Sequence, residues 1–287
     1  MKGFSYVKYK YAVLSQRFRI ICRSFRHPLE FLGVLGKAPF TATGFSFAKR
    51  WETEPARRAA AEVKGPAPVA GENPLWDYFD AHRTGKIICK WRHYFDIYHR
   101  HFAQFRGREV RILEIGVACG GSLEMWRNYF GEKCTVVGMD IDERCKAFEK
   151  DGFRIFIGDQ TNRAFWRHLK EQVPMFDIII DDGGHKAEQQ VVTLEELLPY
   201  LRPGGVYLCE DVHHAHQGFA AYIGGLGDHF NLTDIIRGKD LTARPSAFQQ
   251  DIAAIHRYPF VVVLQKTTEP SPLFCSYYRG TDYLPEP

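Results

Sequence analysis

The chain has 287 residues, enough for one large domain or for one domain with an extension. Hydrophobic residues make up 45% of it and charged residues 25%, which is ordinary for a globular protein, and a net charge of +4 is too small to indicate nucleic acid. Seven scattered cysteines without a C-x-x-C pair indicate reduced thiols in the cytoplasm, not a disulfide framework, and no apolar run approaches the roughly 20 residues of a membrane span.

The first 26 residues are basic and aromatic, and no acidic residue precedes Glu30. Arginines interrupt every apolar stretch, which excludes a secretory signal. Two interpretations stay open: a peripheral contact with an anionic membrane surface, or a solvated or partner-docked arm, which is favoured. Residues 54–74 are rich in Ala, Pro, Gly and charge, as is typical of a linker. We therefore expect an arm and linker over 1–75 and one folded domain over 76–287.

Aromatic side chains recur at three- and four-residue spacings between Asn73 and Arg106, which predicts helices. Core packing against a sheet explains most of these rings, whereas His93 and Tyr94 are candidates to reach a ligand crevice.

The stretch from Val110 to Ser122 contains the first candidate ligand site. Val110–Val117 is an apolar run of the kind that forms a strand buried in a parallel sheet. Glycines follow at 116, 120 and 121, and Ser122 is placed to cap a helix that runs to Gly131. A strand, a glycine turn and a helix start let the backbone approach a ligand and leave N–H groups free to bind it.

The glycine spacing differs from the dinucleotide fingerprint G-x-G-x-x-G, because it runs Glu114, Gly116, Gly120 and Gly121. An acid at this strand end would repel a phosphate but suits a cationic group, such as the amino-acid part of S-adenosylmethionine. The motif resembles the first motif of class I S-adenosylmethionine-dependent methyltransferases. A glycine turn in another α/β protein is the alternative.

Strands and helices then alternate, which predicts a doubly wound parallel sheet with right-handed crossovers. The expected strands are Thr135–Ile141, Phe153–Gly158, Phe176–Ile180 and Val206–Cys209, and the expected helices are Arg144–Lys150, Ala164–Gln172 and Lys186–Leu201. We expect residues 234–255 to be partly helical. Strands at Pro259–Lys266 and Leu273–Tyr278 would complete a seven-stranded sheet.

Five consecutive strands end in acidic residues, at the sheet edge where such folds bind ligands. These residues are Glu114, Asp140, Asp159, Asp181, Asp182, Glu210 and Asp211. Asp140 lies 24 positions after Gly116, where an acid accepts hydrogen bonds from ribose hydroxyls. Asp159 and Gln160 are candidates for the adenine amino group, and Asp181 is a further cofactor-binding candidate. Helix caps or turns are the alternative roles of these aspartates.

Asp182, Glu210 and Asp211 follow the fourth and fifth strands, which we expect to be neighbours. Three converging carboxylates repel each other unless a cation binds them, and oxygen ligands suit Mg²⁺. His185 lies three residues past Asp182 and is a candidate general base for a hydroxyl proton. Separate helix caps and surface acids are the alternative. The histidines at 213, 214 and 216 leave open a non-haem iron site, which the adjacent hard-oxygen ligands disfavour.

Taken together, the ordered motifs resemble the metal-dependent sugar O-methyltransferases of macrolide biosynthesis, of the mycinamicin and macrocin type. The matching segments begin at Leu113, Gly158, Asp177 and Gly204, and the resemblance covers about Trp76–Lys266. It implies that Asp182, Glu210 and Asp211 bind Mg²⁺ and that His185 is the general base. Gly184 stands where a serine is common, and the auxiliary substrate-binding domain of the macrolide enzymes is not recognisable. Some relatives are labelled cephalosporin hydroxylases, which keeps the oxygenase alternative open.

The sequence thus predicts a Rossmann-like S-adenosylmethionine-dependent, Mg²⁺-assisted O-methyltransferase. The expected acceptor is a hydroxyl of a sugar or glycosylated small molecule in natural-product biosynthesis. The cofactor-binding candidates are Glu114, Gly116, Gly120, Ser122, Asp140, Asp159, Gln160 and Asp181. A homo-oligomer is compatible with the sequence, and a non-catalytic cofactor-binding protein is the second alternative.

Overall fold

The computed structural model describes residues 37–39, 41–49, 73–213, 218–231, 235–236, 242–277 and 279–280. The chain divides into two units, Met1–Val69 and Ala70–Pro287. In the first unit, residues 37–39 and 41–49 are helical and exposed. The predictions for the basic segment 1–26 and for most of the linker lie outside the described residues. Among the described helices, none has the length and apolar character needed to cross a membrane.

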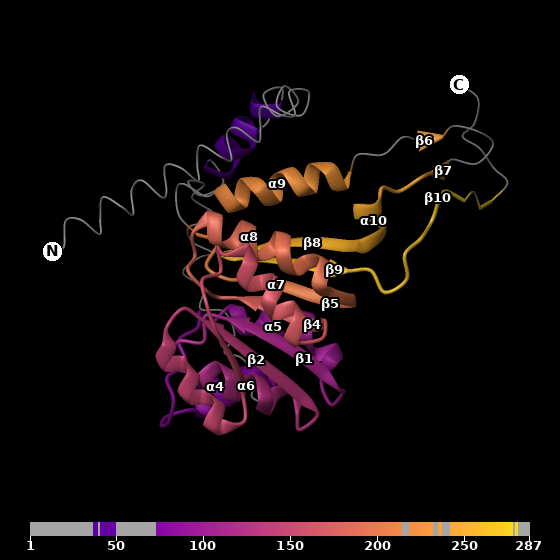
Figure 1. The fold of residues 1–287 in the computed structure, drawn as a ribbon. Helices are drawn as coiled ribbons and strands as arrows, with labels where there is room; N and C mark the ends of the chain where they lie inside the picture. Colours follow the sequence, from indigo (N-terminus) through magenta and orange to yellow (C-terminus); the bar gives the residue numbers. More distant parts are fainter. Residues whose placement is uncertain are drawn as a thin grey trace, which may run out of the picture. The chain divides into compact units, whose positions relative to one another are not determined.

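A seven-stranded sheet forms the centre of the second unit, in the order β3-β2-β1-β4-β5-β9-β8 (Figure 1). Its strands are β1 Val110–Ile115, β2 Cys134–Asp140, β3 Arg154–Ile157, β4 Phe176–Asp181, β5 Leu201–Cys209, β8 Ile252–Tyr258 and β9 Val261–Lys266. The first five pair in parallel, and β9 is antiparallel to both β5 and β8. The fold is therefore a Rossmann-like, doubly wound sheet, as the alternation of strands and helices predicts.

Helices cover both faces of this sheet (Figure 1). On one face lie α4 Pro74–Ala81, α5 Tyr94–Phe102 and α6 Gly121–Phe130; on the other lie α7 Arg163–Gln172, α8 Ala187–Leu197 and α9 Gly218–Phe230. Alternate strand residues supply the two cores: Ile112 packs towards α6, whereas Leu113 packs towards α7 and α8. Most of the aromatic stripe between residues 73 and 106 is indeed core, with Phe95, Tyr98 and Phe102 fully buried.

Local sequence explains where several of these elements begin. The side chain of Asn73 accepts hydrogen bonds from the N–H groups of Leu75 and Trp76, and Asn162 caps α7 in the same way. Helix α4 therefore begins directly after the Asn73 cap. The segment predicted as a helix at Arg144–Lys150 is a 3₁₀ helix, η2, spanning Glu143–Asp151. The helix predicted to run to Leu201 ends earlier, at Leu197, followed by the 3₁₀ helix η3 at Leu198–Tyr200.

The prediction for the last strand of the sheet was wrong. Residues 234–255 were expected to be partly helical, which α10, Ala247–Asp251, confirms, but the sequence did not predict β8, which starts directly after α10 and belongs to the seven-stranded sheet. Pairing with β9 in a hairpin decides the conformation of β8, which local periodicity could not indicate. The Leu273–Tyr278 segment was expected to complete the seven-stranded sheet. Among its described residues, β10 Phe274–Cys275 instead joins a separate small sheet with β7 Thr242–Ala243 and β6 Ile235–Ile236.

Candidate active site

A cavity of about 740 Å³ opens at the carboxyl ends of the five parallel strands. Residues that follow each of these strands line it, and residues 87–92 with Tyr94 form a further part of its wall. The predicted site residues that line it are Gly116, Ser122, Asp140, Asp159, Gln160, Asp182, His185, Glu210 and Asp211. The parallel order of the sheet therefore brings most of the predicted set to one place.

The glycine loop after β1 is packed closely against its neighbours. Gly116 has φ +89°, and a Cβ there would lie 2.0 Å from the carbonyl oxygen of Asp182. Gly120 has φ +77° and is the N-cap of α6, and its Cβ would lie 2.9 Å from the Phe148 ring. The space beside the Cα of Gly120 is therefore filled by Phe148.

Ser122 is not the helix cap that the sequence predicted, since it lies in the first turn of α6. Its hydroxyl donates to Glu114 Oε2 at 2.8 Å, and the Trp126 indole N–H donates to Glu114 Oε1 at 3.0 Å. Burial raises the pKa of the fully buried Glu114 to about 7. Ser122 lines the cavity, whereas Glu114 does not. Glu114 thus ties strand β1 to helix α6 beneath the loop, and its contact with a cofactor stays a prediction.

Asp140 stands at the cavity wall with a fixed carboxylate. Its Oδ2 accepts from the Ala118 N–H and its Oδ1 from the Asp142 N–H, both at 2.9 Å. Asp159 is exposed, and its carboxylate accepts from the backbone and hydroxyl of Thr161. Both aspartates keep free lone pairs that can accept ligand hydrogen bonds.

Gln160 and Asp181 are buried and hold the loop after β4. The amide of Gln160 donates to Asp181 Oδ1 at 3.2 Å and accepts from the Gly184 N–H at 2.7 Å. Asp181 also accepts from the Tyr207 hydroxyl, and burial raises its pKa to about 6. Asp181 does not line the cavity. Both side chains are therefore positioned to orient Gly183 and Gly184, while direct cofactor contact stays a prediction.

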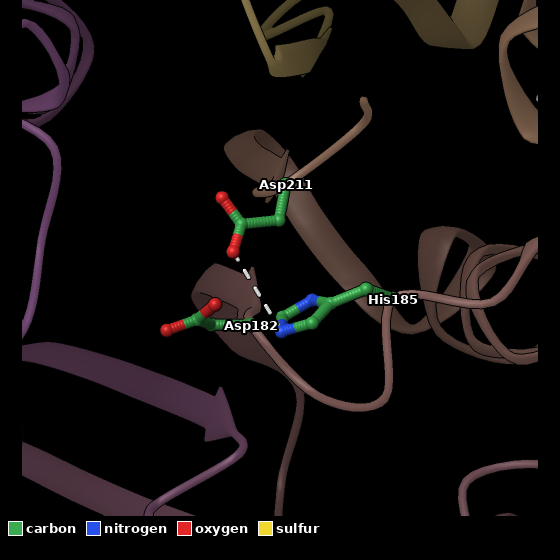
Figure 2. Close-up of side chains that lie close together, drawn as sticks. All are labelled: Asp182, His185 and Asp211. Carbon is green, nitrogen blue, oxygen red and sulfur yellow. Dashed lines mark ion pairs between the residues drawn. The ribbon is translucent and has the colours of Figure 1, made fainter. Parts of the chain in front are cut away.

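Asp182, His185 and Asp211 form an acid–imidazole cluster at this cavity. Each offers a ligand atom within 4.8 Å of the others, and His185 points its ring towards the two carboxylates (Figure 2). Nε2 of His185 lies 3.7 Å from Oδ2 of Asp211. Both residues have positive φ, +53° and +52°. Strained backbone of this kind persists mainly at functional sites. Two carboxylates and an imidazole are donors that suit a divalent cation, so these residues fit a metal.

Glu210, the third predicted metal ligand, already has a cationic partner that the sequence did not reveal. The ammonium of Lys90 lies 2.9 Å from Glu210 Oε2 and 2.5 Å from Asp182 Oδ2. The side chains of Lys90 and Glu210 are only 3% and 1% exposed. Burial acts to lower the pKa of Lys90, but attraction to Glu210 and Asp182 outweighs it and raises the pKa well above its usual value. Burial acts to raise the pKa of Glu210, and the attraction to Lys90 opposes it.

Two aromatic side chains next to Lys90 contact the same cluster. The Tyr94 hydroxyl donates to Asp211 Oδ1 at 2.6 Å, and the Trp91 indole N–H donates to the same oxygen at 3.2 Å. Tyr94 therefore reaches the crevice as expected. His93 instead lies outside the cavity, beside the Pro259 carbonyl. Lys90 and Trp91 lie just before helix α5, in a segment that shows no periodic pattern. Their closeness in sequence to Tyr94, a predicted crevice residue, was the only feature that pointed to them.

The arrangement of the cluster does not favour the alternative of a non-haem iron site built from the histidines at 213, 214 and 216. His213 Nε2 lies 3.8 Å from Asp211 Oδ1, but among the described residues His213 is not part of the converging set. The two other histidines of that hypothesis, at 214 and 216, lie outside the described residues.

The strand order, the glycine loop and the acids at the strand ends together define a methyltransferase domain. Residues 113–212 match the family described as a methyltransferase domain. This match, together with the curated relatives and a solved structure, confirms the expected resemblance to class I methyltransferases of the macrolide sugar type.

Two curated relatives are similar to this chain over more than half of its length. Demethylmacrocin O-methyltransferase of Streptomyces fradiae is 31% identical over 59% of this chain and 47% of its own length. The 8-demethyl-8-(2-methoxy-alpha-L-rhamnosyl)-tetracenomycin-C 3'-O-methyltransferase of Streptomyces olivaceus is 31% identical over 61% of this chain and 50% of its own. The chain therefore spans about half the length of the curated relatives it matches.

A solved structure has the same fold. It is the MycE methyltransferase from the mycinamycin biosynthetic pathway, in complex with Mg, SAH and mycinamycin VI. It is 26% identical, with a TM-score of 0.55, over 68% of this chain and 53% of its own.

Proposed function

We propose that this protein transfers the methyl group of S-adenosylmethionine to a hydroxyl of a sugar on a glycosylated small molecule, with Mg²⁺ as the metal. The observation that carries the proposal is the convergence of Asp182, His185 and Asp211 at the cavity beside the glycine loop. The name of one relative states a rhamnosyl tetracenomycin, which supports the acceptor class. The MycE structure is described with Mg and SAH, which supports the metal and the cofactor.

In this proposal the glycine loop and strand ends hold the cofactor. Gly116 lets the backbone approach it closely, Ser122 borders its site, and Asp140 accepts hydrogen bonds from the ribose hydroxyls. Asp159, which lines the cavity, would accept a hydrogen bond from the adenine amino group. Glu114, Gln160 and Asp181 act on the cofactor through the loops that they fix.

The acceptor site is assigned to the acid–imidazole cluster. Asp182 and Asp211 would hold the metal. Glu210 would become a third ligand if the ammonium of Lys90 moved away from its carboxylate. Bound Mg²⁺ would lower the pKa of the acceptor hydroxyl, and S-adenosylmethionine would supply an electrophilic methyl group. His185 would accept the hydroxyl proton at Nε2, the nitrogen that faces Asp211. The negative charge of Asp211 would stabilise the imidazolium that forms.

The test is an assay for S-adenosylhomocysteine formation with a panel of glycosides, including rhamnosides. The proposal expects turnover that a chelator abolishes and added Mg²⁺ restores. Turnover that persists in chelator would contradict the metal role. S-adenosylhomocysteine binding without turnover on any glycoside would instead favour a non-catalytic cofactor-binding protein. The division into residues 1–75 and 76–287, the membrane contact of the basic segment, the homo-oligomer and the cytoplasmic location stay predictions.

A further inference from the structure

An exposed indole stands at the cavity wall, directly beside the acid–imidazole cluster. Trp91 is 51% exposed and lines the cavity, whereas Trp126 and Trp166 are completely buried. Exposure of a large apolar ring to water is unfavourable, and such rings at a cavity often mark a binding surface. The Trp91 face has no role in the metal or proton chemistry proposed above, so its exposure needs another explanation.

The ring of Trp91 is held in one orientation. Its N–H donates to Asp211 Oδ1 at 3.2 Å, and its centroid lies 5.4 Å from the Phe260 ring. Phe260 itself has φ +65°, a left-handed conformation that is costly for a bulky residue. The segment around Trp91 is also held on both sides. Before it, Lys90 forms an ion pair with Glu210, and after it, the Tyr94 hydroxyl donates a hydrogen bond to Asp211. The indole is thus pre-organised, with its edge on the acid–imidazole cluster and part of its surface open.

We propose that Trp91 is the stacking platform for the acceptor sugar. A pyranose ring has an apolar C–H face, which matches an indole face, and hydroxyls around its rim. A ring stacked on Trp91 would direct one rim hydroxyl towards Asp211, Asp182 and His185, because the indole N–H already contacts Asp211. The inference rests on the proposed function and adds to it the residue that selects the acceptor class.

The experiment is saturation-transfer NMR on the full chain with S-adenosylhomocysteine and Mg²⁺, using methyl α-L-rhamnopyranoside and methyl β-D-glucopyranoside as probes. Wild type should transfer saturation mainly to C–H protons of one sugar face. Trp91→Leu, which removes the aromatic face, should weaken sugar binding by about fivefold or more. Trp91→Phe, which keeps a face without the N–H, should lose less. S-adenosylhomocysteine affinity, measured by calorimetry, should be the same in all three.

Tyr277→Leu is the control, because Tyr277 is 73% exposed but does not line the cavity; it should leave sugar binding unchanged. Equal sugar binding by wild type and Trp91→Leu would overturn the proposal, as would a wild type that shows no transfer to either sugar. A Trp91→Leu variant that loses S-adenosylhomocysteine instead would also overturn it, since the indole would then serve the cofactor. Failure of the wild type to bind S-adenosylhomocysteine would count against the proposed function itself.

Discussion

Nε2 of His185 lies 3.7 Å from Oδ2 of Asp211, although the two residues follow different strands, β4 and β5. The parallel pairing of β4 with β5, which sets Asp181 opposite Cys209, brings the two segments together. This pair joins the proposed proton acceptor to a proposed metal ligand, so the two roles need separate tests.

His185→Ala should separate the base from the metal. We expect turnover to fall on the order of 10²- to 10⁴-fold, the usual size of a general-base effect. Mn²⁺ affinity, followed by electron paramagnetic resonance, should change little. Asp211→Asn is the matched variant, and it should weaken Mn²⁺ binding because a charged ligand is lost. A parallel loss of Mn²⁺ affinity in His185→Ala would instead make His185 a metal ligand.

Lys90→Met tests whether the buried ammonium competes with the metal for Asp182 and Glu210. Removing its charge should tighten Mn²⁺ binding by about tenfold, equivalent to ~1.4 kcal/mol. Lys86→Met is the control, because Lys86 pairs with Glu124 and Asp151 instead. Circular dichroism would verify that both variants fold. Unchanged Mn²⁺ affinity in Lys90→Met would show that Lys90 does not oppose metal binding.

Glu114 gives a prediction for the pH dependence of stability. Burial raises its pKa from 4.5 to about 7, so between these values the folded state keeps a proton that the unfolded state has lost. The free energy of unfolding should therefore fall as pH rises through this window, by on the order of 2 kcal/mol from Glu114 alone. Glu114→Gln, which is neutral throughout, should remove that part of the slope. Urea unfolding at about pH 5 and about pH 7.5 measures it, and an identical slope in the variant would contradict the assignment.

Gly120→Ala should weaken S-adenosylhomocysteine binding by displacing the glycine loop. The added Cβ would meet the Phe148 ring at 2.9 Å, and φ +77° is strained for alanine. Adding Phe148→Leu should recover part of the affinity by making room for that Cβ. Calorimetry on wild type, both single variants and the double variant measures this. No recovery would mean that the Cβ acts on the ligand directly.

The sequence predicted the position of the site best where the residue types and the strand pattern both indicated the same edge of the sheet. Acids at consecutive strand ends predicted one crevice, because parallel strands place their carboxyl ends at a common edge. It could not reveal that Lys90 lies against Glu210, since the two are 120 positions apart and no periodicity joins them. Nor could it show that Glu114 and Asp181 turn away from the cavity, because side-chain direction at a strand end depends on packing. The strand β8 was missed for a similar reason: its pairing with β9 is a tertiary contact.

A crystal structure with S-adenosylhomocysteine and Mn²⁺ tests the account most directly, through the anomalous difference map of the metal. We predict one Mn²⁺ peak within about 2.5 Å of carboxylate oxygens of both Asp182 and Asp211, with S-adenosylhomocysteine against Gly116 and Asp140. A map with Lys90 still between Asp182 and Glu210 and no Mn²⁺ peak at these aspartates would contradict the proposed site.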